Sequence, residues 1–236
     1  MQNSNFIVSV ANGHHAFYAQ QICDEMAASA QARGTGIAKR TAPYIAEKIN
    51  EGKAVIALSR DGQWAGFCYI ETWGHGNYVA NSGLIVAPAF RKSGLARDIK
   101  KKIFELSRTK YPNAKIFGLT TGLAVMKINS ELGYEPVTYS QLTDDEEFWK
   151  GCRSCVNHEI LQSKGRKNCM CTAILYDPVE KEKNSGKKFW DFAKNSKLYE
   201  RFMRLKQNIM LKGSSSAKAT EDKGAEKRSL INFFNF

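Results

Sequence analysis

One segment of the chain, residues 84–96, constrains the fold more than any other. Residues 84–86 are uniformly apolar, as in a strand that is buried on both faces of a sheet. A pattern of apolar residues with the 3.6-residue period of a helix begins at Leu95, after a short turn. A buried strand that passes through a short turn into a helix is typical of a sheet with parallel strand pairing and helical crossovers.

The turn itself, residues 91–96, combines two cations with a glycine, in the order Arg91, Lys92, Ser93, Gly94, Leu95 and Ala96. The first N–H groups of a helix have no partner within the helix and lie at the positive end of its dipole. Glycine allows a ligand to approach the backbone closely, and the cations add charge. The turn therefore predicts a phosphate site. The alternative interpretation is that Gly94 only shapes the turn and that the basic pair is solvated.

The rest of the chain up to residue 176 alternates in a way that predicts a mixed α/β sheet. Early segments read as antiparallel hairpins, with an Asp-Gly turn at residues 61–62, and later ones read as strand, helix, strand, helix. Strands are expected at residues 6–10, 54–58, 64–72, 78–86, 115–119 and 172–176, and helices at residues 14–33, 41–50, 95–106 and 122–132.

The charge of the chain is unevenly distributed. The whole sequence carries +12, but residues 181–236 hold 14 basic and 6 acidic residues, so the part before them carries only +4. Nucleic acid is therefore not the expected partner of the folded body. Four regions are predicted: a main domain over 1–150, a Cys-rich element completing the sheet over 151–180, a basic and helical extension over 181–212, and a flexible tail over 213–236.

Membrane insertion and export are not expected. No run of eighteen apolar residues occurs, and the first nine residues lack the basic and then apolar layout of a signal peptide. We expect a soluble, cytoplasmic protein. The apolar end of the chain, residues 230–236, follows a polar spacer and suits a short peptide that binds a groove on a partner protein.

The turn resembles the signature of the GNAT superfamily, the coenzyme A-dependent N-acyltransferases. That signature places Arg or Gln, two residues, Gly, one residue and then Gly or Ala after a strand, and here the matching residues are Arg91, Gly94 and Ala96. The ending Glu131-Leu132-Gly133-Tyr134 is similar to the family's usual closing motif. The resemblance covers roughly residues 6–139. It implies a GNAT-like fold and an acyl-CoA, usually acetyl-CoA, as co-substrate.

The resemblance also assigns roles. It implies that residues 91–96 hold the pyrophosphate of coenzyme A and that Leu84, Ile85 and Val86 lie beside its pantetheine arm. Many members carry a tyrosine, the general acid, four residues before the glycine of the closing motif, whereas this chain has Asn129 there. An amide cannot donate a proton as a phenol does, so Asn129 is expected to hydrogen-bond the coenzyme or the thioester. Glu71 and His75 are the candidate bases, unless they are a solvated carboxylate and a loop histidine.

The segment between the first two expected helices, residues 31–41, is the candidate acceptor site. It carries Arg33, Lys39 and Arg40, which suit the recognition of carboxylates. This segment and residues 118–126 resemble the short bacterial acyltransferases assigned to the glutamate N-acylation step of arginine biosynthesis. The resemblance implies transfer of an acetyl or succinyl group to glutamate. The alternative for the arginines is that they cap helix ends and bind solvent.

Four of the six cysteines lie in two close pairs, Cys152 with Cys155 and Cys169 with Cys171. The first pair has the spacing of a zinc knuckle, and the second is one residue shorter than the common form. A structural zinc ion is predicted, with His158 able to replace one ligand; unbound or redox-active thiols and packing cysteines remain alternatives. Cys23 and Cys68 are expected in the core.

A second class of function stays open from the sequence. The basic extension and the cysteine pairs could recruit a macromolecule, so that the chain would be a protein-directed acetyltransferase or an acetyl-CoA binding module. The near-neutral body and the cationic segment 33–41 favour a small-molecule amine instead.

Overall fold

The structure of the protein is a computed structural model that describes residues 5–33 and 39–184. These residues belong to the first of two compact units, Met1–Asn195. The second unit, Ser196–Phe236, lies outside the described residues, and so does nearly all of the predicted basic extension and the whole of the predicted tail. Within the described residues, no helix is long and apolar enough to cross a membrane.

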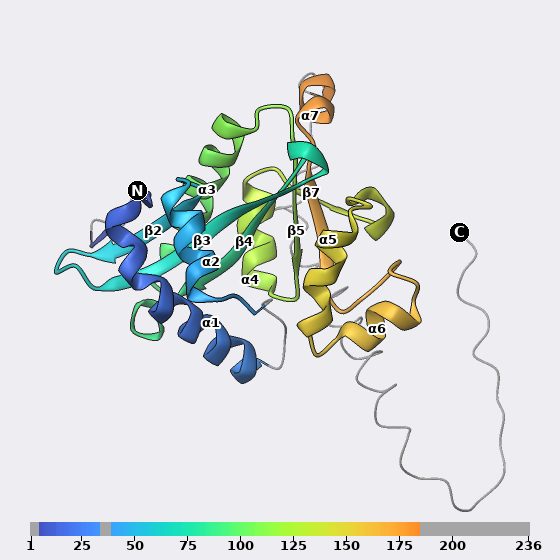
Figure 1. The fold of residues 1–236 in the computed structure, drawn as a ribbon. Coiled ribbons are helices and arrows are strands. Elements are labelled where there is room, and N and C mark those ends of the chain that lie inside the picture. Colours follow the sequence, from blue (N-terminus) through green and yellow to red (C-terminus); the bar gives the residue numbers. More distant parts are fainter. Residues whose placement is uncertain (1–4, 34–38, 185–236) are drawn as a thin grey trace, which may run out of the picture. The chain divides into compact units, whose positions relative to one another are not determined.

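The helices and strands follow the alternation expected from the sequence (Figure 1). In chain order they are β1 (Phe6–Val10), η1 (Gly13–Tyr18), α1 (Ala19–Arg33), α2 (Ala42–Asn50), β2 (Ala54–Ser59), β3 (Trp64–Trp73), η2 (Gly74–Gly76), β4 (Tyr78–Val86), η3 (Pro88–Phe90), α3 (Leu95–Lys110), β5 (Lys115–Thr120), α4 (Leu123–Glu131), β6 (Glu135–Val137), η4 (Tyr139–Gln141), α5 (Glu146–Lys150), η5 (Gly151–Ser154), α6 (His158–Ser163), β7 (Thr172–Tyr176) and α7 (Pro178–Asn184).

The strands of the described residues form one seven-stranded sheet in the order β1-β2-β3-β4-β5-β7-β6. Neighbours pair antiparallel except β4 and β5, which pair parallel. The expectation of a mixed α/β sheet is therefore confirmed. The last strand in the chain, β7, inserts between β5 and β6, so the segment that follows the cysteine pairs becomes an interior strand of the sheet.

Helices cover both faces of the sheet. One apolar cluster joins α1 and α2 to one face through Ile22, Ile45 and Phe67, and a second joins α3 to the other face through Ile99 and Ile103. A third cluster, around Phe117 and Trp149, packs the segment from α5 to α6 against β5 and β7. The amphipathic pattern of α3 that was read from the sequence thus forms its sheet-facing side.

The long helix expected over residues 14–33 is instead a 3-10 helix followed by α1. The side chain of Asn12 accepts a hydrogen bond from the N–H of His14, and the N–H of Asn12 donates to Nδ1 of His15. This reciprocal capping starts a helical turn at Gly13, before the α-helical repeat begins. Thr41 precedes α2 as expected, but its side chain makes no capping hydrogen bond.

Candidate functional site

The strands β4 and β5 separate partway along their length. They pair only from Tyr78 to Ala80 on β4 and from Lys115 to Phe117 on β5. Beyond these residues β5 continues to pair with β7 up to Thr120, while β4 turns away toward α3. The two strands therefore leave an opening in the middle of the sheet, and residues of β4 and β5 beyond the paired segment line a pocket there.

Gly83 is the position at which β4 bends. The ladder between β3 and β4 shifts register between Phe67 and Tyr69, opposite this part of β4. Gly83 has φ of 65°, and a Cβ atom there would lie 2.5 Å from Cε1 of Tyr69 and 2.7 Å from Cε of Met26. Only glycine satisfies both the left-handed backbone and the close packing.

An open groove of about 790 Å³ runs along the end of β4 and the first turns of α3 and α4. Its walls are mostly apolar, which suits a flexible chain with few charges, and the turn before α3 supplies its cationic end. The residues that the sequence assigned to coenzyme A and that line this groove are Leu84, Ile85, Val86, Arg91, Lys92, Gly94, Leu95 and Ala96. Ser93 is not among the lining residues, because its hydroxyl donates to the carbonyl of Phe90 over 2.7 Å.

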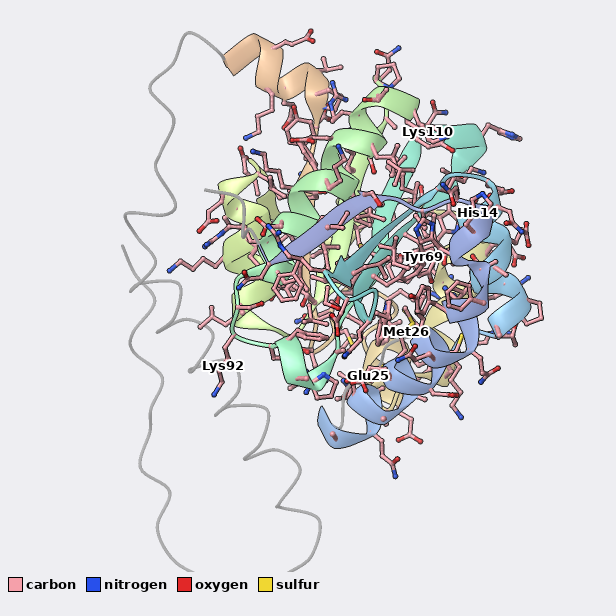
Figure 2. The ribbon with its side chains drawn as sticks, turned by 90° about the vertical axis from the view of Figure 1, so that its left-hand side faces the viewer. His14, Glu25, Met26, Tyr69, Lys92 and Lys110 are labelled. Atoms are coloured by element: carbon pink, nitrogen blue, oxygen red, sulfur yellow. The ribbon has the colours of Figure 1, made fainter. Side chains whose placement is uncertain are left out.

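The turn before α3 has the backbone geometry of an anion site. Lys92 and Gly94 both have positive φ, 65° and 88°, and Gly94 is the N-cap of α3 without any side-chain capping hydrogen bond. Among the first-turn N–H groups, that of Leu95 lies 3.4 Å from Oγ of Ser93 and that of Arg97 donates to the carbonyl of Gly94 over 2.9 Å. The positive end of the helix dipole still faces the groove here, together with Arg91 and Lys92. Glu25 of α1 and Lys92 lie toward the same end of this unit in Figure 2, and both line the groove.

Arg91 is held in place by the opposite wall of the groove. Its Nη2 donates to Oε1 of Glu25 over 2.7 Å and to Oγ of Ser29 over 2.9 Å, and its Nε donates to the carbonyl of Val86 over 3.1 Å. The side chain still has 48% of its surface exposed. Arg91 is thus fixed at the mouth of the groove and keeps N–H groups free to meet a phosphate.

A second cavity, the inner pocket, has a volume of about 270 Å³ and meets the groove at Leu84 and Val125, which line both. It lies in the opening between β4 and β5. Its other lining residues are Arg40, Tyr69, Ala80, Asn81, Ser82, Gly83, Lys100, Phe117, Gly118, Leu119, Thr120, Thr121, Gly122, Asn129, Phe148, Cys171 and Ile174. A small ligand in the inner pocket would thus contact the end of a ligand that occupies the groove.

An ion pair organises one wall of the inner pocket. Nη2 of Arg40 lies 2.7 Å from Oε1 of Glu71, and Nε of Arg40 donates to the hydroxyl of Tyr69 over 2.8 Å. That hydroxyl donates in turn to Glu71 over 3.0 Å. Burial acts to lower the pKa of Arg40, but Tyr69 and Glu71 together raise it above its ordinary value. Arg40 is therefore a permanent cation at the pocket wall.

The opposite wall carries two buried polar side chains that the sequence did not single out as a pair. Lys100 of α3 is 4% exposed and Asn129 of α4 is 2% exposed. Oδ1 of Asn129 has no hydrogen-bond partner in the structure. Lys100 gave no signal in the sequence, because it begins the run Lys100-Lys101-Lys102 and such a run reads as a solvated face. Arg97 also lines the groove. This residue was not predicted from the sequence, because no motif or spacing distinguishes it from a solvated helix residue.

The remaining predicted site residues are placed as follows. Glu71 contacts two lining residues, Arg40 and Tyr69, but is not itself a lining residue. His75 is exposed on the turn after β3, with φ of 54°, and lines neither the groove nor the inner pocket. Lys39 is exposed and lines neither cavity, and the side chain of Arg33 lies outside the described residues.

The four paired cysteines lie close enough to affect one another. A hydrogen bond with Cys169, together with burial, raises the pKa of Cys171 far above its ordinary value, and burial and Cys155 raise that of Cys152 to about 11. However, residues 5–33 and 39–184 contain no group of three or more His, Cys, Asp or Glu side chains that could hold a metal ion. The predicted zinc site is not confirmed.

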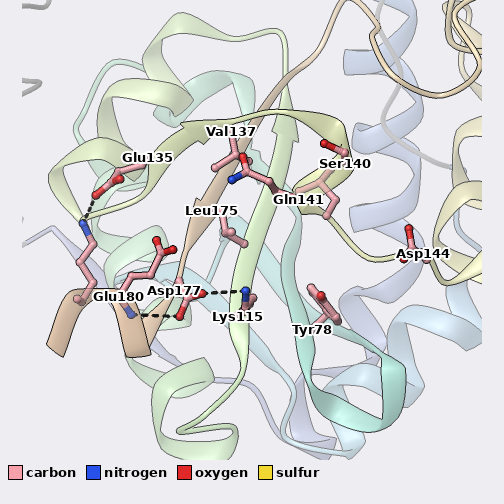
Figure 3. A pocket seen from close by; sticks show the side chains of 12 residues that line it. Tyr78, Lys115, Glu135, Val137, Ser140, Gln141, Asp144, Leu175, Asp177 and Glu180 are labelled. Atoms are coloured by element: carbon pink, nitrogen blue, oxygen red, sulfur yellow. Dashed lines mark hydrogen bonds and ion pairs between the residues drawn. The ribbon is translucent and has the colours of Figure 1, made fainter. Parts of the chain in front are cut away.

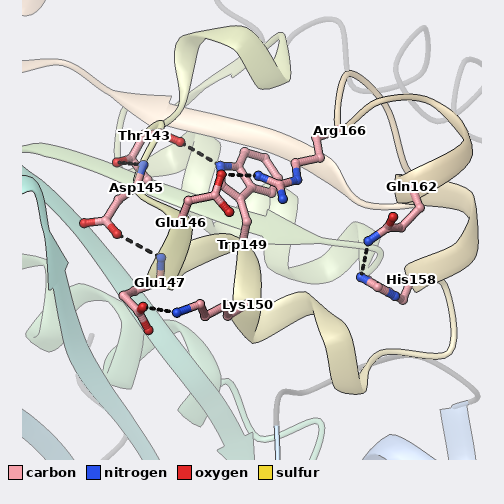
Figure 4. A network of polar contacts seen from close by, with 9 residues as sticks. All are labelled: Thr143, Asp145, Glu146, Glu147, Trp149, Lys150, His158, Gln162 and Arg166. Carbon is pink, nitrogen blue, oxygen red and sulfur yellow. Dashed lines mark hydrogen bonds and ion pairs between the residues drawn. The ribbon is translucent and has the colours of Figure 1, made fainter.

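The segment from α5 to α6 is tied together by polar contacts of its own (Figure 4). Nε1 of Trp149 donates to the carbonyl of Thr143 over 3.0 Å, and Arg166 pairs with Glu146 over 2.6 Å. The ring of His158, the alternative zinc ligand, instead hydrogen-bonds the side chain of Gln162 over 3.1 Å. These contacts link the parts of the segment that flanks the cysteine pairs.

A third cavity, of about 280 Å³, lies near the start of β5 and the end of β7 (Figure 3). Four of its charged side chains pair across it: Lys115 with Asp177 over 2.9 Å and Lys181 with Glu135 over 2.6 Å. Both lysines of this cavity are therefore already neutralised by carboxylates, unlike Lys100 of the inner pocket.

Comparison with known proteins identifies the kind of fold that carries these cavities. Residues 19–124 match the model of the acetyltransferase (GNAT) family. This match spans α1 to the start of α4, and so includes the groove-forming end of β4, the turn and α3. No curated protein sequence matches the chain significantly.

Solved structures resemble the chain at the level of the fold. An N-acetylglutamate synthase from Neisseria gonorrhoeae, complexed with coenzyme A and N-acetyl-glutamate, superimposes with a TM-score of 0.51 at 14% identity over 73% of this chain. The chain spans only 35% of that protein. Rv2747 from Mycobacterium tuberculosis, in complex with CoA and a second ligand, gives a TM-score of 0.50 at 16% identity over 72% of this chain and 98% of its own.

Proposed function

Because residues 19–124 match the model of the acetyltransferase (GNAT) family, we propose that this protein transfers an acetyl or succinyl group from coenzyme A to the amine of a small acidic amino acid, with glutamate as the first candidate. In this proposal acetyl-CoA, or another acyl-CoA, occupies the groove and the acceptor occupies the inner pocket.

The observation that carries the proposal is the junction of the two cavities. A groove of about 790 Å³ leads to a pocket of about 270 Å³, and the two share Leu84 and Val125. An acyl group at the end of the groove would therefore meet an amine held in the pocket. A pocket of this volume suits an amino acid better than a folded protein surface, because it is a small recess in the opening of the sheet.

In this proposal the acyl-CoA donor binds at the turn before α3. Its N–H groups and Arg91 and Lys92 would hold the pyrophosphate, and the apolar wall of residues 84–86 would flank the pantetheine arm. Since β4 no longer pairs with β5 beyond Ala80, its backbone groups can bind the arm as a further strand would.

The acidic acceptor is supported by the cation at the pocket wall. Arg40 uses three of its five N–H groups, on Tyr69, Glu71 and the carbonyl of Lys39, which leaves two to bind a carboxylate. The fold-level likeness to an N-acetylglutamate synthase supports the same choice of acceptor. Arg33 and Lys39 remain candidates for a second carboxylate contact.

The proposed reaction proceeds by direct attack. The neutral amine of the acceptor attacks the thioester carbon, the N–C bond forms, and the C–S bond breaks with its electron pair on sulfur. Holding both reactants at the cavity junction supplies the orientation that an uncatalysed collision lacks. Glu71, through its bond to Arg40, positions the acceptor in this scheme; its role as base, and that of His75, stay predictions.

The test is a measurement of free coenzyme A thiol, released from acetyl-CoA or succinyl-CoA in the presence of one amine at a time. The panel contains glutamate, aspartate, glutamine, lysine, spermidine and a basic peptide. Turnover that is selective for glutamate supports the proposal, and glutamine is the matched control for the side-chain carboxylate. Turnover with the peptide or spermidine alone would refute the acidic acceptor while keeping the acyl transfer.

A protein-directed enzyme is the second candidate, and the observation that favours it is the charge of residues 181–236, which hold 14 basic and 6 acidic residues. Removing these residues separates the two proposals. A small-molecule enzyme keeps its rate on a free amine after the deletion, whereas a recruited enzyme loses its rate on a protein substrate.

A further inference from the structure

Lys100 is a buried cation that has no anionic partner among the ion pairs of the described residues. Its side chain lies on the sheet-facing side of α3, where it is 4% exposed. The titratable groups that face it are Cys68 of β3 and Tyr134 after α4, whose ring centre lies 5.8 Å from Nζ. A buried ammonium without an anionic partner is costly unless a ligand compensates it.

Asn129 supplies an independent sign of a ligand at the same place. It is 2% exposed, its Oδ1 has no hydrogen-bond partner, and both it and Lys100 line the inner pocket. Buried side-chain oxygens are nearly always hydrogen-bonded in folded proteins. The pair therefore matches a ligand that brings a negative charge toward Lys100 and an N–H group toward Asn129.

The position of this pair follows from the helix repeat. On α3, Ala96 lines the groove and Lys100, four residues later, lines the inner pocket; on α4, Val125 lines both cavities and Asn129 is four residues later. Residues four apart lie on one helix face, one turn further along. Both side chains therefore continue, inside the inner pocket, helix faces whose preceding turns line the groove.

A further contact links the two helices. Arg97 of α3 pairs with Glu131 of α4 through two hydrogen bonds, of 2.8 Å and 3.0 Å. The groove meets the inner pocket at Leu84 and Val125, which line both. The arm of a thioester that fills the groove and passes this junction would enter the pocket that Lys100 and Asn129 line.

We propose that Lys100 donates the proton that the coenzyme A sulfur takes up when the acyl group is transferred, and that Asn129 accepts a hydrogen bond from an N–H group of the bound thioester substrate. This inference rests on the proposed function only in that the substrate of the groove is a coenzyme A thioester. It gives the reaction a proton donor, since this chain has Asn129 at the position where many GNAT members carry a tyrosine as the general acid.

The step balances as follows. The acceptor enters as a neutral amine, its nitrogen bonds to the thioester carbon, and the C–S bond breaks with the electron pair on sulfur. The proton on Nζ of Lys100 moves to that sulfur and forms the free thiol. The new amide nitrogen loses one proton to water, and the neutral Lys100 takes one proton back from water after the thiol leaves.

The environment of Lys100 fits this role. Burial lowers its pKa below the ordinary value, and the opposing effect of Cys68 is smaller. A lowered pKa of the ammonium moves toward the pKa of a thiol, which is about 8.5 for an unperturbed cysteine, and so favours proton transfer to the sulfur. In the complex with free coenzyme A, the same cation would stabilise the thiolate form of the coenzyme.

The deciding experiment is an ultraviolet titration of the thiol of coenzyme A bound to the full chain. The complex with desulfo-coenzyme A is the blank, and its absorbance is subtracted to correct for the protein's own cysteines. We expect the thiol pKa of bound coenzyme A to lie at least one unit below that of free coenzyme A, and to return to the free value in Lys100→Met. Lys100→Arg keeps the shift, because it keeps the charge. Lys101→Met, at an exposed neighbour, behaves as the unchanged protein.

The titration does not depend on knowing the acceptor. If no amine supports turnover, the shift in thiol pKa still decides whether Lys100 faces the sulfur. An equal thiol pKa in the unchanged protein and in Lys100→Met, with coenzyme A bound in both, overturns the proposal. Where an acceptor is found, Lys100→Met should lower kcat about a hundredfold with the KM for acetyl-CoA unchanged; an unchanged kcat would overturn it too.

Discussion

The guanidinium of Arg40 lies 2.7 Å from the carboxylate of Glu71, across 31 residues of sequence, with 21% and 12% of the two side chains exposed. The hydroxyl of Tyr69 bonds to both members of the pair. Arg40 belongs to the segment before α2, and Glu71 belongs to β3, so this contact joins the start of α2 to the wall of the inner pocket.

Removing either charge of this pair should destabilise the protein. We expect Glu71→Gln and Arg40→Met each to lower the free energy of unfolding by about 2 kcal/mol, because each leaves a mostly buried partner unpaired. The double variant should lose less than the sum of the two. Urea unfolding of all four proteins measures this coupling. Strictly additive losses would show that the two side chains do not interact.

Gly83→Ala should be among the most damaging small substitutions in the sheet. The alanine would have to keep the left-handed φ of 65°, and its Cβ would lie 2.5 Å from Tyr69 and 2.7 Å from Met26. We expect a loss of about 2–4 kcal/mol, measured by thermal or urea unfolding. Gly151→Ala is the matched control, since no atom lies within 4 Å of its Cβ position and its φ is −60°; it should change stability by less than about 0.5 kcal/mol.

Arg91→Met should weaken acyl-CoA binding more than it affects the acceptor. Its guanidinium is fixed at the mouth of the groove by Glu25 and Ser29. Loss of one charged contact to a phosphate predicts an increase in the KM for acetyl-CoA of about tenfold. Arg153→Met, at an exposed residue outside the groove, is the control. A rise confined to the acceptor KM would place the pyrophosphate elsewhere.

Asp177 should make stability depend on acid pH. Burial acts to raise its pKa, but hydrogen bonds from Lys115 and from the N–H groups of Val179 and Glu180 lower it below the ordinary value. Aspartates of the unfolded chain have a pKa of about 3.9. Around this pH the folded protein therefore binds fewer protons than the unfolded chain.

The stabilisation is thus complete above that pH and is lost as the pH falls through the lower, folded pKa. Asp177→Asn should cost about 1 kcal/mol at pH 7, a modest value because 42% of the Lys115 side chain is exposed. The difference from the unchanged protein should shrink at pH 3. A difference that stays constant between urea curves at the two pH values would contradict this linkage.

The thiols of the cysteine segment should differ in reactivity. Burial and neighbouring thiols raise the pKa of Cys152 to about 11 and that of Cys171 still further. Because the thiolate is the reactive form, both should be alkylated by iodoacetamide at pH 8 more than tenfold more slowly than in urea. Mass spectrometry of timed samples measures this. Equal rates in folded and unfolded protein would contradict the described burial.

Zinc at these cysteines stays a prediction of the sequence. If the spacing of the two pairs does reflect zinc, protein that is expressed with zinc should contain about one ion per chain. Alkylation of all four thiols should then slow together. Metal analysis that finds far less than one ion would leave the segment held by its own contacts, such as Trp149 to Thr143 and Arg166 to Glu146.

The sequence by itself determined the features that depend on consecutive residues. The buried end of β4, the cationic turn and the amphipathic α3 lie where the apolar runs, the glycine and the 3.6-residue period placed them. The hairpin of β2 and β3 likewise follows from a local Asp-Gly turn, in which Gly62 has φ of 80°. Such features are local because backbone sterics and side-chain periodicity act within a few residues.

Only the tertiary structure decided how distant residues combine into a site. The opening between β4 and β5, the pairing of Arg40 with Glu71, and the burial of Lys100 in the inner pocket depend on strand register and on which helix faces meet. Lys100 shows the reason most clearly. Within its own run of lysines it is indistinguishable from its exposed neighbours, and only packing of α3 against the sheet removes it from water and places it opposite Asn129.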